Sequence, residues 1–252
     1  MPRKAREKSE SGNYHIILRG INKQIIFEDE EDNTKFLQTL NEYKDKSGYK
    51  IYGYCLMGNH AHILLQEVEE GIETIMRRIG SSYVYWYNWK YKRCGHLFQD
   101  RYKSEPIENE SYFLTVLRYI HQNPVKAGIT KNIESYKWSS YNKFIDKEGI
   151  ADIDFVLKIF DSNREKAIEK FKTYHKEIND EKCLDIEEKR RSTDDEAIEV
   201  IKRICNLKSC LEIQKIDQHT RDKYLKRLKE EGLSTRQITR LTGISRGIVL
   251  KS

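Results

Sequence analysis

The feature that most constrains the fold is a pair of β-rich runs separated by a two-residue turn signal. The runs are residues 49–57 (YKIYGYCLM) and 61–66 (AHILLQ), and Gly58 and Asn59 lie between them. A short loop with glycine and asparagine suits the tight turn that joins two antiparallel strands. The sequence therefore predicts a β-hairpin, and with it a sheet that is at least partly antiparallel.

The hairpin lies within an alternating series of strand and helix patterns. A strand is predicted over 13–19, and a helix begins with Asp32 or Asn33 as its N-cap and runs to about Lys46. After the hairpin we predict a helix over 71–92, a strand over 96–103 and a helix over 110–122, which ends at Asn123-Pro124 because proline disfavours helical geometry before it. This order predicts an α+β fold with helices on a mainly antiparallel sheet, followed by an all-α C-terminal region.

Charge and aromatic content favour a nucleic acid partner. The formal net charge is +6, and the chain has 16 tyrosines, whose rings can stack on unpaired bases while cations neutralise phosphates. The five cysteines include no CxxC pair, so neither a zinc module nor a disulfide framework is expected. The polar N-terminus and the lack of a long apolar run predict a cytoplasmic protein with no membrane span.

Two histidines at the start of the second hairpin strand are candidate metal ligands. His60 and His62 are two residues apart, so on a strand they point to the same face and could bind one divalent cation together. In the alternative interpretation, one ring packs in the sheet and the other faces solvent. The pair alone does not decide between these.

A tyrosine on the third predicted helix is a candidate nucleophile. Tyr119 and Asn123 are four residues apart and share a helix face, which places a phenol beside an amide. A phenol needs activation near neutral pH, and a neighbouring cation would help to generate the phenolate. Alternatively, Tyr119 is an ordinary packing residue of an amphipathic helix.

Taken together, these motifs resemble those of the single-tyrosine HUH transposases, and in particular the REP-associated tyrosine transposases. The resemblance covers residues 12–145 and rests on Tyr14-His15 with Arg19, on Gly58 to His62, on residues 97–103 (LFQDRYK), and on Tyr119-Ile120 with residues 123–128 (NPVKAG). Alanine at position 61 departs from the bulky apolar residue of the family pattern.

The resemblance implies a ferredoxin- or RRM-like HUH fold and a specific chemistry. His60, His62 and Asn123 would hold Mg²⁺ or Mn²⁺, and Tyr119 would attack a phosphodiester of single-stranded, hairpin-containing DNA. The product would be a 5′-phosphotyrosine bond and a free 3′-hydroxyl. Monomer and homodimer both stay open. Arg19, Arg101 and Lys103 are candidate phosphate contacts, although each could equally be an ordinary surface cation.

The aromatic run of the second helix has two interpretations. Rings between positions 83 and 91 could stack bases, but their spacing fits packing in a core, either as Val84 with Tyr87 and Tyr91 or as Tyr85 with Trp89. We favour a core position for most of them.

The C-terminal segment resembles a DnaA-like helix-turn-helix. Ser234 fits a helix N-cap, Gly243 permits a turn, and Ser245 would cap a second helix. Arg236, Arg240 and Arg246 are its candidate DNA contacts. The predicted organisation is a flexible leader over 1–12, a catalytic domain over 13–145, a charged helical connector over 146–194 and a DNA-binding module over 195–252.

Two rival functions use the same sequence features. A replication or relaxase-like nickase would share the histidines and the tyrosine, and a domesticated regulator would keep only DNA binding. The presence of all four site residues, His60, His62, Tyr119 and Asn123, favours a catalytic protein.

Overall fold

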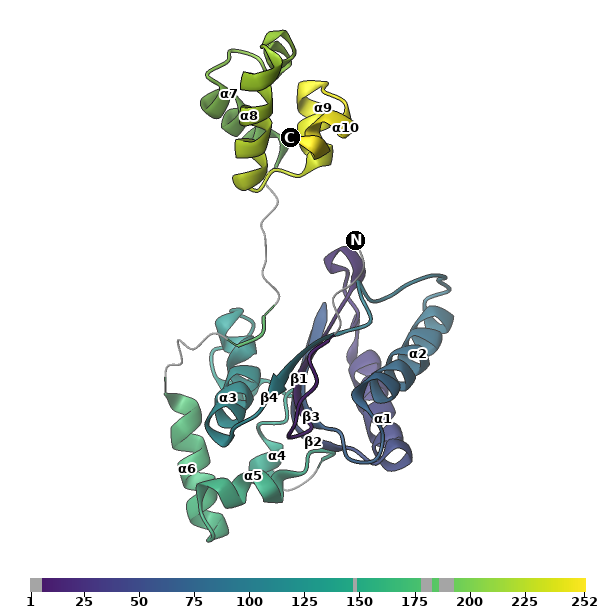
Figure 1. Ribbon diagram of the computed structural model, residues 1–252. Helices are drawn as coiled ribbons and strands as arrows, with labels where there is room; N and C mark the ends of the chain where they lie inside the picture. The colour runs from purple at the N-terminus through teal and green to yellow at the C-terminus, as the bar shows by residue number, and fades with distance from the viewer. Residues whose placement is uncertain (1–5, 147–148, 178–182, 186–192) are drawn as a thin grey trace. The chain divides into compact units, whose positions relative to one another are not determined.

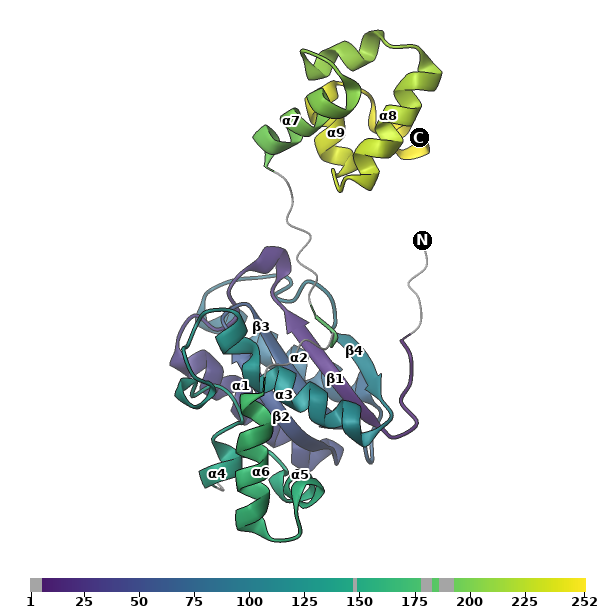
Figure 2. The same ribbon diagram turned by 90° about the vertical axis from the view of Figure 1, so that its left-hand side faces the viewer.

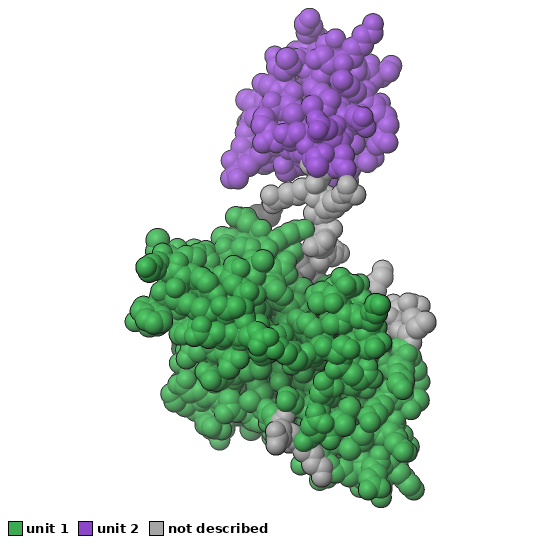
Figure 3. Space-filling view, turned by 180° about the vertical axis from the view of Figure 1, so that it is seen from behind, with its two compact units in different colours: residues 1–185 green, residues 186–252 purple. Residues whose placement is uncertain are grey.

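The protein is described by a computed structural model over residues 6–146, 149–177, 183–185 and 193–252. Two compact units divide the chain, one comprising residues 1–185 and the other residues 186–252 (Figure 3). Each unit has its own buried apolar core, so each is described by itself.

The first unit contains the alternating strands and helices. Its elements are β1 (Asn13–Arg19), η1 (Ile21–Lys23), α1 (Glu30–Ser47), β2 (Lys50–Met57), β3 (His60–Gln66), α2 (Ile72–Lys90), β4 (Lys103–Ile107), α3 (Glu110–Lys126), η2 (Ile133–Ser135), α4 (Lys143–Asp146), α5 (Ile153–Phe160) and α6 (Arg164–Lys176).

The four strands form one antiparallel sheet in the order β2-β3-β1-β4. The predicted hairpin is present, since Met57 and His60 are paired across the Gly58-Asn59 turn. A strand–helix–strand–strand–helix–strand chain with this order is the ferredoxin-like arrangement. The predicted α+β fold class is thus confirmed.

Helices cover both faces of the sheet, with α1 and α2 on one face and α3 on the other (Figures 1 and 2). Alternation along β1 explains this, because Tyr14, Ile16 and Leu18 belong to the core under α1 and α2. The residues between them face α3. The site residues lie on this second face, between the sheet and α3.

The last strand begins later than the sequence predicts. Residues 96–102 were expected to be part of a strand, but β4 starts only at Lys103. Within 96–102 a single bridge joins Phe98 to Gly20, and the backbone N–H of Gln99 donates to the Arg19 carbonyl. Buried Leu97 accounts for the strand-like pattern, because the segment packs against the end of β1 without forming a ladder.

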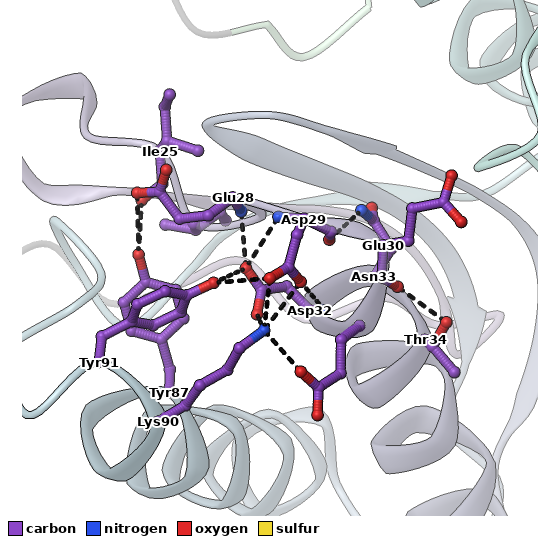
Figure 4. A network of polar contacts seen from close by, with 12 residues as sticks. Ile25, Glu28, Asp29, Glu30, Asp32, Asn33, Thr34, Tyr87, Lys90 and Tyr91 are labelled. Carbon is purple, nitrogen blue, oxygen red and sulfur yellow. Dashed lines mark hydrogen bonds and ion pairs between the residues drawn. The ribbon is translucent and has the colours of Figure 1, made fainter.

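Helix α1 begins three residues earlier than expected. Its N-cap is Asp29, not Asp32 or Asn33. The Asp29 side chain accepts from the Asp32 N–H, and the Asp32 side chain accepts in return from the Asp29 N–H, which forms a capping box. Lys90 at the end of α2 binds both carboxylates and adds Glu31 to the network (Figure 4). The acidic cluster therefore links α1 to α2.

Helix α3 does not end before Asn123-Pro124, so that prediction was wrong. Pro124 lies inside the helix, which continues to Lys126. A proline this close to the C-terminal end removes only one helical hydrogen bond, and Gly128, with φ of 70°, ends the helix instead. The extra turn keeps Asn123 in helical geometry.

Residues of the expected connector contribute to the first unit. α5 and α6 pack beside α3 in the core that includes Val156 and Phe171. Gln122 of α3 donates hydrogen bonds from Nε2 to the carbonyls of His175 and Glu177, at 2.9 and 2.8 Å. The charged run 187–191 and residues 1–5 of the leader lie outside the described residues, whereas Arg6 of the leader donates to the Tyr102 carbonyl.

The second unit is helical in its described part. It contains α7 (Asp194–Cys205), η3 (Cys210–Lys215), α8 (Gln218–Glu230), α9 (Thr235–Thr242) and α10 (Arg246–Lys251). Ser234 caps α9 by accepting from the Gln237 N–H, and Gly243 ends α9 with a left-handed φ of 72°. The two short helices and the turn between them fit the predicted helix-turn-helix, whose DNA-binding role stays a prediction. No helix in the described ranges is long and apolar enough to cross a bilayer.

Candidate active site

Two histidine rings lie side by side on β3, on the face covered by α3. The centroids of the His60 and His62 rings are 5.0 Å apart, and the next residues along the strand, Ala61 and Ile63, point into the opposite core. The shared face predicted from the spacing is therefore present. His60 is half-buried at the start of the strand, where its Nδ1 is 2.6 Å from Oδ1 of Asn59.

His62 is fully buried, and only one of its two ring nitrogens contacts another polar side chain of the described residues. Its Nδ1 lies 3.0 Å from Nε2 of His15, while its Nε2 is buried with no hydrogen-bond partner among the described residues. Burial first, and then the neighbouring His15 and His60 rings, hold the pKa of His62 well below its usual value. The ring is therefore neutral at physiological pH, the state in which an imidazole nitrogen binds a metal.

The phenol of Tyr119 packs against these histidines. Its ring centroid is 5.8 Å from that of His62 and 5.9 Å from that of His15, both in edge-on geometry. The hydroxyl oxygen is buried near the side chains of Asn123 and Asp185, and it forms no close hydrogen bond within the described part of the chain. Burial, together with the charge of Asp185, raises the pKa of Tyr119 well above its usual range. The phenol is thus protonated at neutral pH until something stabilises the phenolate.

Helix α3 places two further polar side chains on the Tyr119 side. Asn123 is half-buried one turn later, and its Nδ2 is 3.5 Å from the Tyr119 carbonyl. The ammonium of Lys126, one turn further, lies 5.1 Å from the centre of the Tyr119 ring. The spacing of these residues at helical intervals explains why they share this face.

The three basic candidates in the first unit separate into two groups. Arg19 pairs with His60 across β1 and β3, and exposed Lys103 pairs with Ile17 across β1 and β4, so both are on the histidine face. Arg101 instead lines a cleft of about 650 Å³ beside Arg77 of α2, on the other side of the sheet. The structure therefore brings Arg19 and Lys103, but not Arg101, to the histidine face.

The basic candidates in the second unit are on α9 and α10. Arg236, Arg240 and Arg246 are all exposed, and Arg240 forms an ion pair with Asp194 at the start of α7. Their role in DNA binding stays a prediction.

Sequence reasoning assigned no role to three residues that complete the site. His15 of β1 contacts His62, and Glu105 of β4 places Oε2 3.9 Å from Nδ1 of His15. Asp185 lies near enough to Tyr119 and His15 to influence both through its charge. The alternation of His15 with Ile17 and Arg19 hinted at a shared face, but only the strand order shows what lies opposite it.

The side chains of His60, His62 and Asn123 together suit a divalent cation, with two imidazoles and one amide as ligands. Within the described residues no group of three or more His, Cys, Asp or Glu side chains is arranged to hold a metal. The site instead offers two imidazoles, His60 and His62, with Asn123 on the facing helix. The buried Nε2 of His62 has no hydrogen-bond partner in the part of the chain that the structure describes, and a nitrogen left this way in a core is costly unless a ligand satisfies it. On these grounds the residues fit such an ion.

The fold and the site define a class: a ferredoxin-like domain in which a strand-borne histidine pair faces a helix-borne tyrosine. Residues 8–123 match the model of the family described as transposase IS200 like. No curated protein matches the chain.

Two solved structures give the likeness in three dimensions. One is the structure of a REP-associated tyrosine transposase bound to a REP hairpin, with 18% identity and a TM-score of 0.51 over 61% of this chain and 90% of the other. The other is a Deinococcus radiodurans R1 protein named provisionally as a transposase, with 16% identity and a TM-score of 0.35 over 48% of this chain and 97% of the other. The first shows the fold, and the second is too distant to support an argument.

Residues 8–123 are therefore similar to the IS200-like transposase family. The resemblance identified from the motifs is thereby confirmed. The roles of individual residues are not decided by the family match.

Proposed function

We propose that the protein is a transposase-type endonuclease that cuts and rejoins single-stranded DNA through a covalent bond to Tyr119. The observation that carries the proposal is the contact between the His62 and Tyr119 rings, because it places a buried imidazole, whose Nε2 has no hydrogen-bond partner among the described residues, against a buried phenol. The relative bound to a REP hairpin supports a hairpin-containing strand as the substrate class.

In the proposed reaction the Tyr119 oxygen attacks a DNA phosphorus atom. A bond forms between the phenolic oxygen and phosphorus, and the bond from phosphorus to the 3′-oxygen breaks. The phenolic proton leaves to solvent, and the departing 3′-oxygen takes up a proton to become a free hydroxyl. Because the phosphotyrosine bond stores the energy of the broken linkage, a 3′-hydroxyl can later attack it and restore Tyr119 without a nucleotide cofactor.

The residues around Tyr119 address two needs of phosphoryl transfer, orientation and charge. Packing against His15 and His62 fixes the phenol, and Lys126 adds positive charge over its ring. Arg19 and Lys103 supply cations on the same face of the sheet for the phosphate backbone.

Mg²⁺ or Mn²⁺ would be held by His60, His62 and Asn123. When bound there, the ion would polarise the phosphate and offset the negative charge on its oxygens. It would also favour the phenolate of Tyr119, whose pKa is raised by burial in the metal-free protein.

The test is covalent capture of labelled single-stranded hairpin DNA in the presence of Mn²⁺ or Mg²⁺. We expect an adduct that resists denaturation, and we expect Tyr119→Phe to abolish it. Tyr85→Phe is the matched control, because it removes the hydroxyl of an exposed tyrosine on α2 and should leave the adduct intact. An adduct that persists in Tyr119→Phe would refute the proposed nucleophile.

The metal requirement is tested separately with His60→Ala and His62→Ala. Each variant should lose adduct formation, and the wild-type protein should lose it in EDTA and regain it with excess Mn²⁺. Adduct formation that continues in EDTA would refute the metal site while leaving the nucleophile standing.

A further inference from the structure

A chain of three side chains runs from β4 through β1 to β3 behind the proposed metal site. Glu105, His15 and His62 come from three adjacent strands of the sheet, and both histidines are fully buried. His15 Nε2 is 3.0 Å from His62 Nδ1, and the Glu105 carboxylate lies 3.9 Å from the other nitrogen of His15. Such a contact between two neutral imidazoles requires that one ring donates and the other accepts.

The position of Glu105 decides which ring donates. Its carboxylate is the charged group beside His15 Nδ1, a buried nitrogen that has no hydrogen-bond partner in the described ranges. A carboxylate there favours a proton on Nδ1 and leaves a lone pair on His15 Nε2. Glu105 is itself held in place, because the backbone N–H of Leu184 donates to its Oε2 at 3.1 Å. His62 must then donate from its own Nδ1.

Donation from Nδ1 of His62 to His15 determines the protonation state of the other His62 nitrogen, Nε2. A neutral imidazole with its proton on Nδ1 carries a lone pair on Nε2. In His62 this Nε2 has no hydrogen-bond partner among the described residues, and its ring contacts the rings of His60 and Tyr119. The opposite tautomer would turn an N–H toward the same space, and an N–H cannot bind a cation. The two arrangements therefore differ in whether His62 can act as a ligand.

We propose that His15 and Glu105 are positioning residues, which hold His62 in the Nδ1–H tautomer so that its Nε2 is available to a divalent cation. Metal-binding histidines are commonly oriented by a partner on their second nitrogen, here an imidazole backed by a carboxylate. This inference rests on the proposed function, since it assigns a supporting layer to the same site.

The direct test is the tautomer of His62 in the metal-free, full-length protein. Long-range proton–nitrogen correlation spectra of ¹⁵N-labelled protein in EDTA at pH 8 distinguish protonated from unprotonated ring nitrogens. The His62 signals can be assigned by their loss in His62→Gln. We expect a proton on Nδ1 and a bare Nε2, and a proton on Nε2 in the wild-type protein would overturn the proposal.

Variants then test whether the contacts between Glu105, His15 and His62 matter for metal binding. The measurement is Mn²⁺ affinity by calorimetry on folded protein. His15→Leu removes the acceptor and should weaken binding by about 10- to 100-fold, the range typical for partners of metal ligands. His15→Gln can present a carbonyl oxygen near the position of Nε2 and should restore most of the affinity. Glu105→Gln keeps the shape without the charge and should weaken binding by roughly 10-fold.

His175→Gln is the control for general destabilisation, because His175 is equally buried but contacts His121 rather than the site. It should change Mn²⁺ affinity less than twofold. Unchanged affinity and an unchanged His62 tautomer in His15→Leu would refute the positioning role alone. Failure of the wild-type protein to bind Mn²⁺ would instead refute the metal site of the proposed function, whatever the tautomer.

Discussion

Nδ1 of His121 lies 2.9 Å from Nε2 of His175, and this contact joins α3 to α6 inside the core of the first unit. The chain of contacts has a defined direction, because His175 Nδ1 lies 2.9 Å from the Phe171 carbonyl and must donate to it. His121 therefore donates to His175 and accepts at Nε2 from Ser140, 2.7 Å away. Helix α3, which carries Tyr119, is thus joined to α6 through two buried histidines.

Acidification should destabilise this core. Burial lowers the pKa of His175 to about 3, and burial also holds the pKa of His121 well below its usual value. The unfolded chain binds these protons first, so the stabilisation is complete above about pH 6.5 and falls as the pH decreases toward 3, by up to about 1.4 kcal/mol per pH unit for each group. Urea unfolding between pH 7.5 and 5 measures this slope.

His175→Gln should flatten that slope and cost about 1–3 kcal/mol at pH 7.5, because it removes a titrating imidazole and leaves the Phe171 carbonyl without the Nδ1–H that donates to it. His96→Gln, at an exposed position, is the control and should leave both quantities unchanged. A wild-type stability that does not depend on pH over this range would contradict the assignment of neutral buried histidines.

Lys90 is expected to be the most important cation for the packing of α1 on α2. Its ammonium lies 2.8 Å from carboxylate oxygens of both Asp29 and Asp32, and Asp32 is fully buried (Figure 4). Lys90→Met would leave the Asp32 carboxylate without its cation, and we expect a loss of roughly 2–4 kcal/mol in the free energy of unfolding at pH 7. Lys46→Met removes an exposed, solvent-screened pair and should leave the free energy of unfolding almost unchanged.

The Lys90 effect should depend on pH. Hydrogen bonding to Lys90 holds the pKa of Asp29 below its usual value, so this part of the stabilisation is present above about pH 4 and disappears as the pH falls further. The difference between wild type and Lys90→Met should therefore shrink below pH 4. A difference that grows on acidification would count against the ion-pair explanation.

Local patterns were enough to predict the hairpin and the shared face of His60 and His62, because both depend on neighbours in sequence. Turn chemistry fixes the register, and strand alternation fixes the face. The same local reasoning failed at residues 96–102, where buried Leu97 mimics a strand while the backbone bonds to the end of β1. It also ended α3 too early, since a proline near a helix terminus costs little.

The supporting residues of the site could not be predicted in this way. Glu105 reaches His15 only because β4 pairs with β1, and the chain separates these residues by a hairpin and two helices. Asp185 is still further along the chain. Contacts of this kind follow from strand order, which no single-sequence periodicity encodes.

Gly243 should be essential for the second unit. It has a left-handed φ of 72°, and a methyl group added there would lie 2.2 Å from Nε2 of Gln214, which donates to the Thr242 carbonyl. Gly243→Ala should therefore cost about 2 kcal/mol or more. Gly247→Ala, in α10 with open space around it, should be neutral or slightly stabilising.

The effect of Gly243→Ala on stability can be measured separately for each of the two units. Its three tryptophans, Trp86, Trp89 and Trp138, all belong to residues 1–185, so their fluorescence follows the first unit alone. Gly243→Ala should leave the tryptophan transition unchanged and lower the temperature at which amide signals of residues 194–251 are lost. A matching shift in both signals would show that the two units unfold together.

The aromatic run of α2 divides into buried and exposed rings, and this division predicts different responses to the loss of a hydroxyl. Tyr83 is fully buried and its hydroxyl donates to the Ile26 carbonyl at 2.6 Å, whereas Tyr85 is 78% exposed and Trp89 is 73% exposed. The predicted core packing therefore holds for Tyr83 but is wrong for the Tyr85–Trp89 pair, because the helix turns that stripe to solvent. Tyr83→Phe leaves a buried carbonyl unsatisfied and should cost about 1–2 kcal/mol in urea unfolding, while Tyr85→Phe should change stability by less than about 0.5 kcal/mol. Equal costs for the two variants would mean that the Tyr83 hydroxyl contributes no net hydrogen-bond energy to the packing of α2 against the segment that contains Ile26.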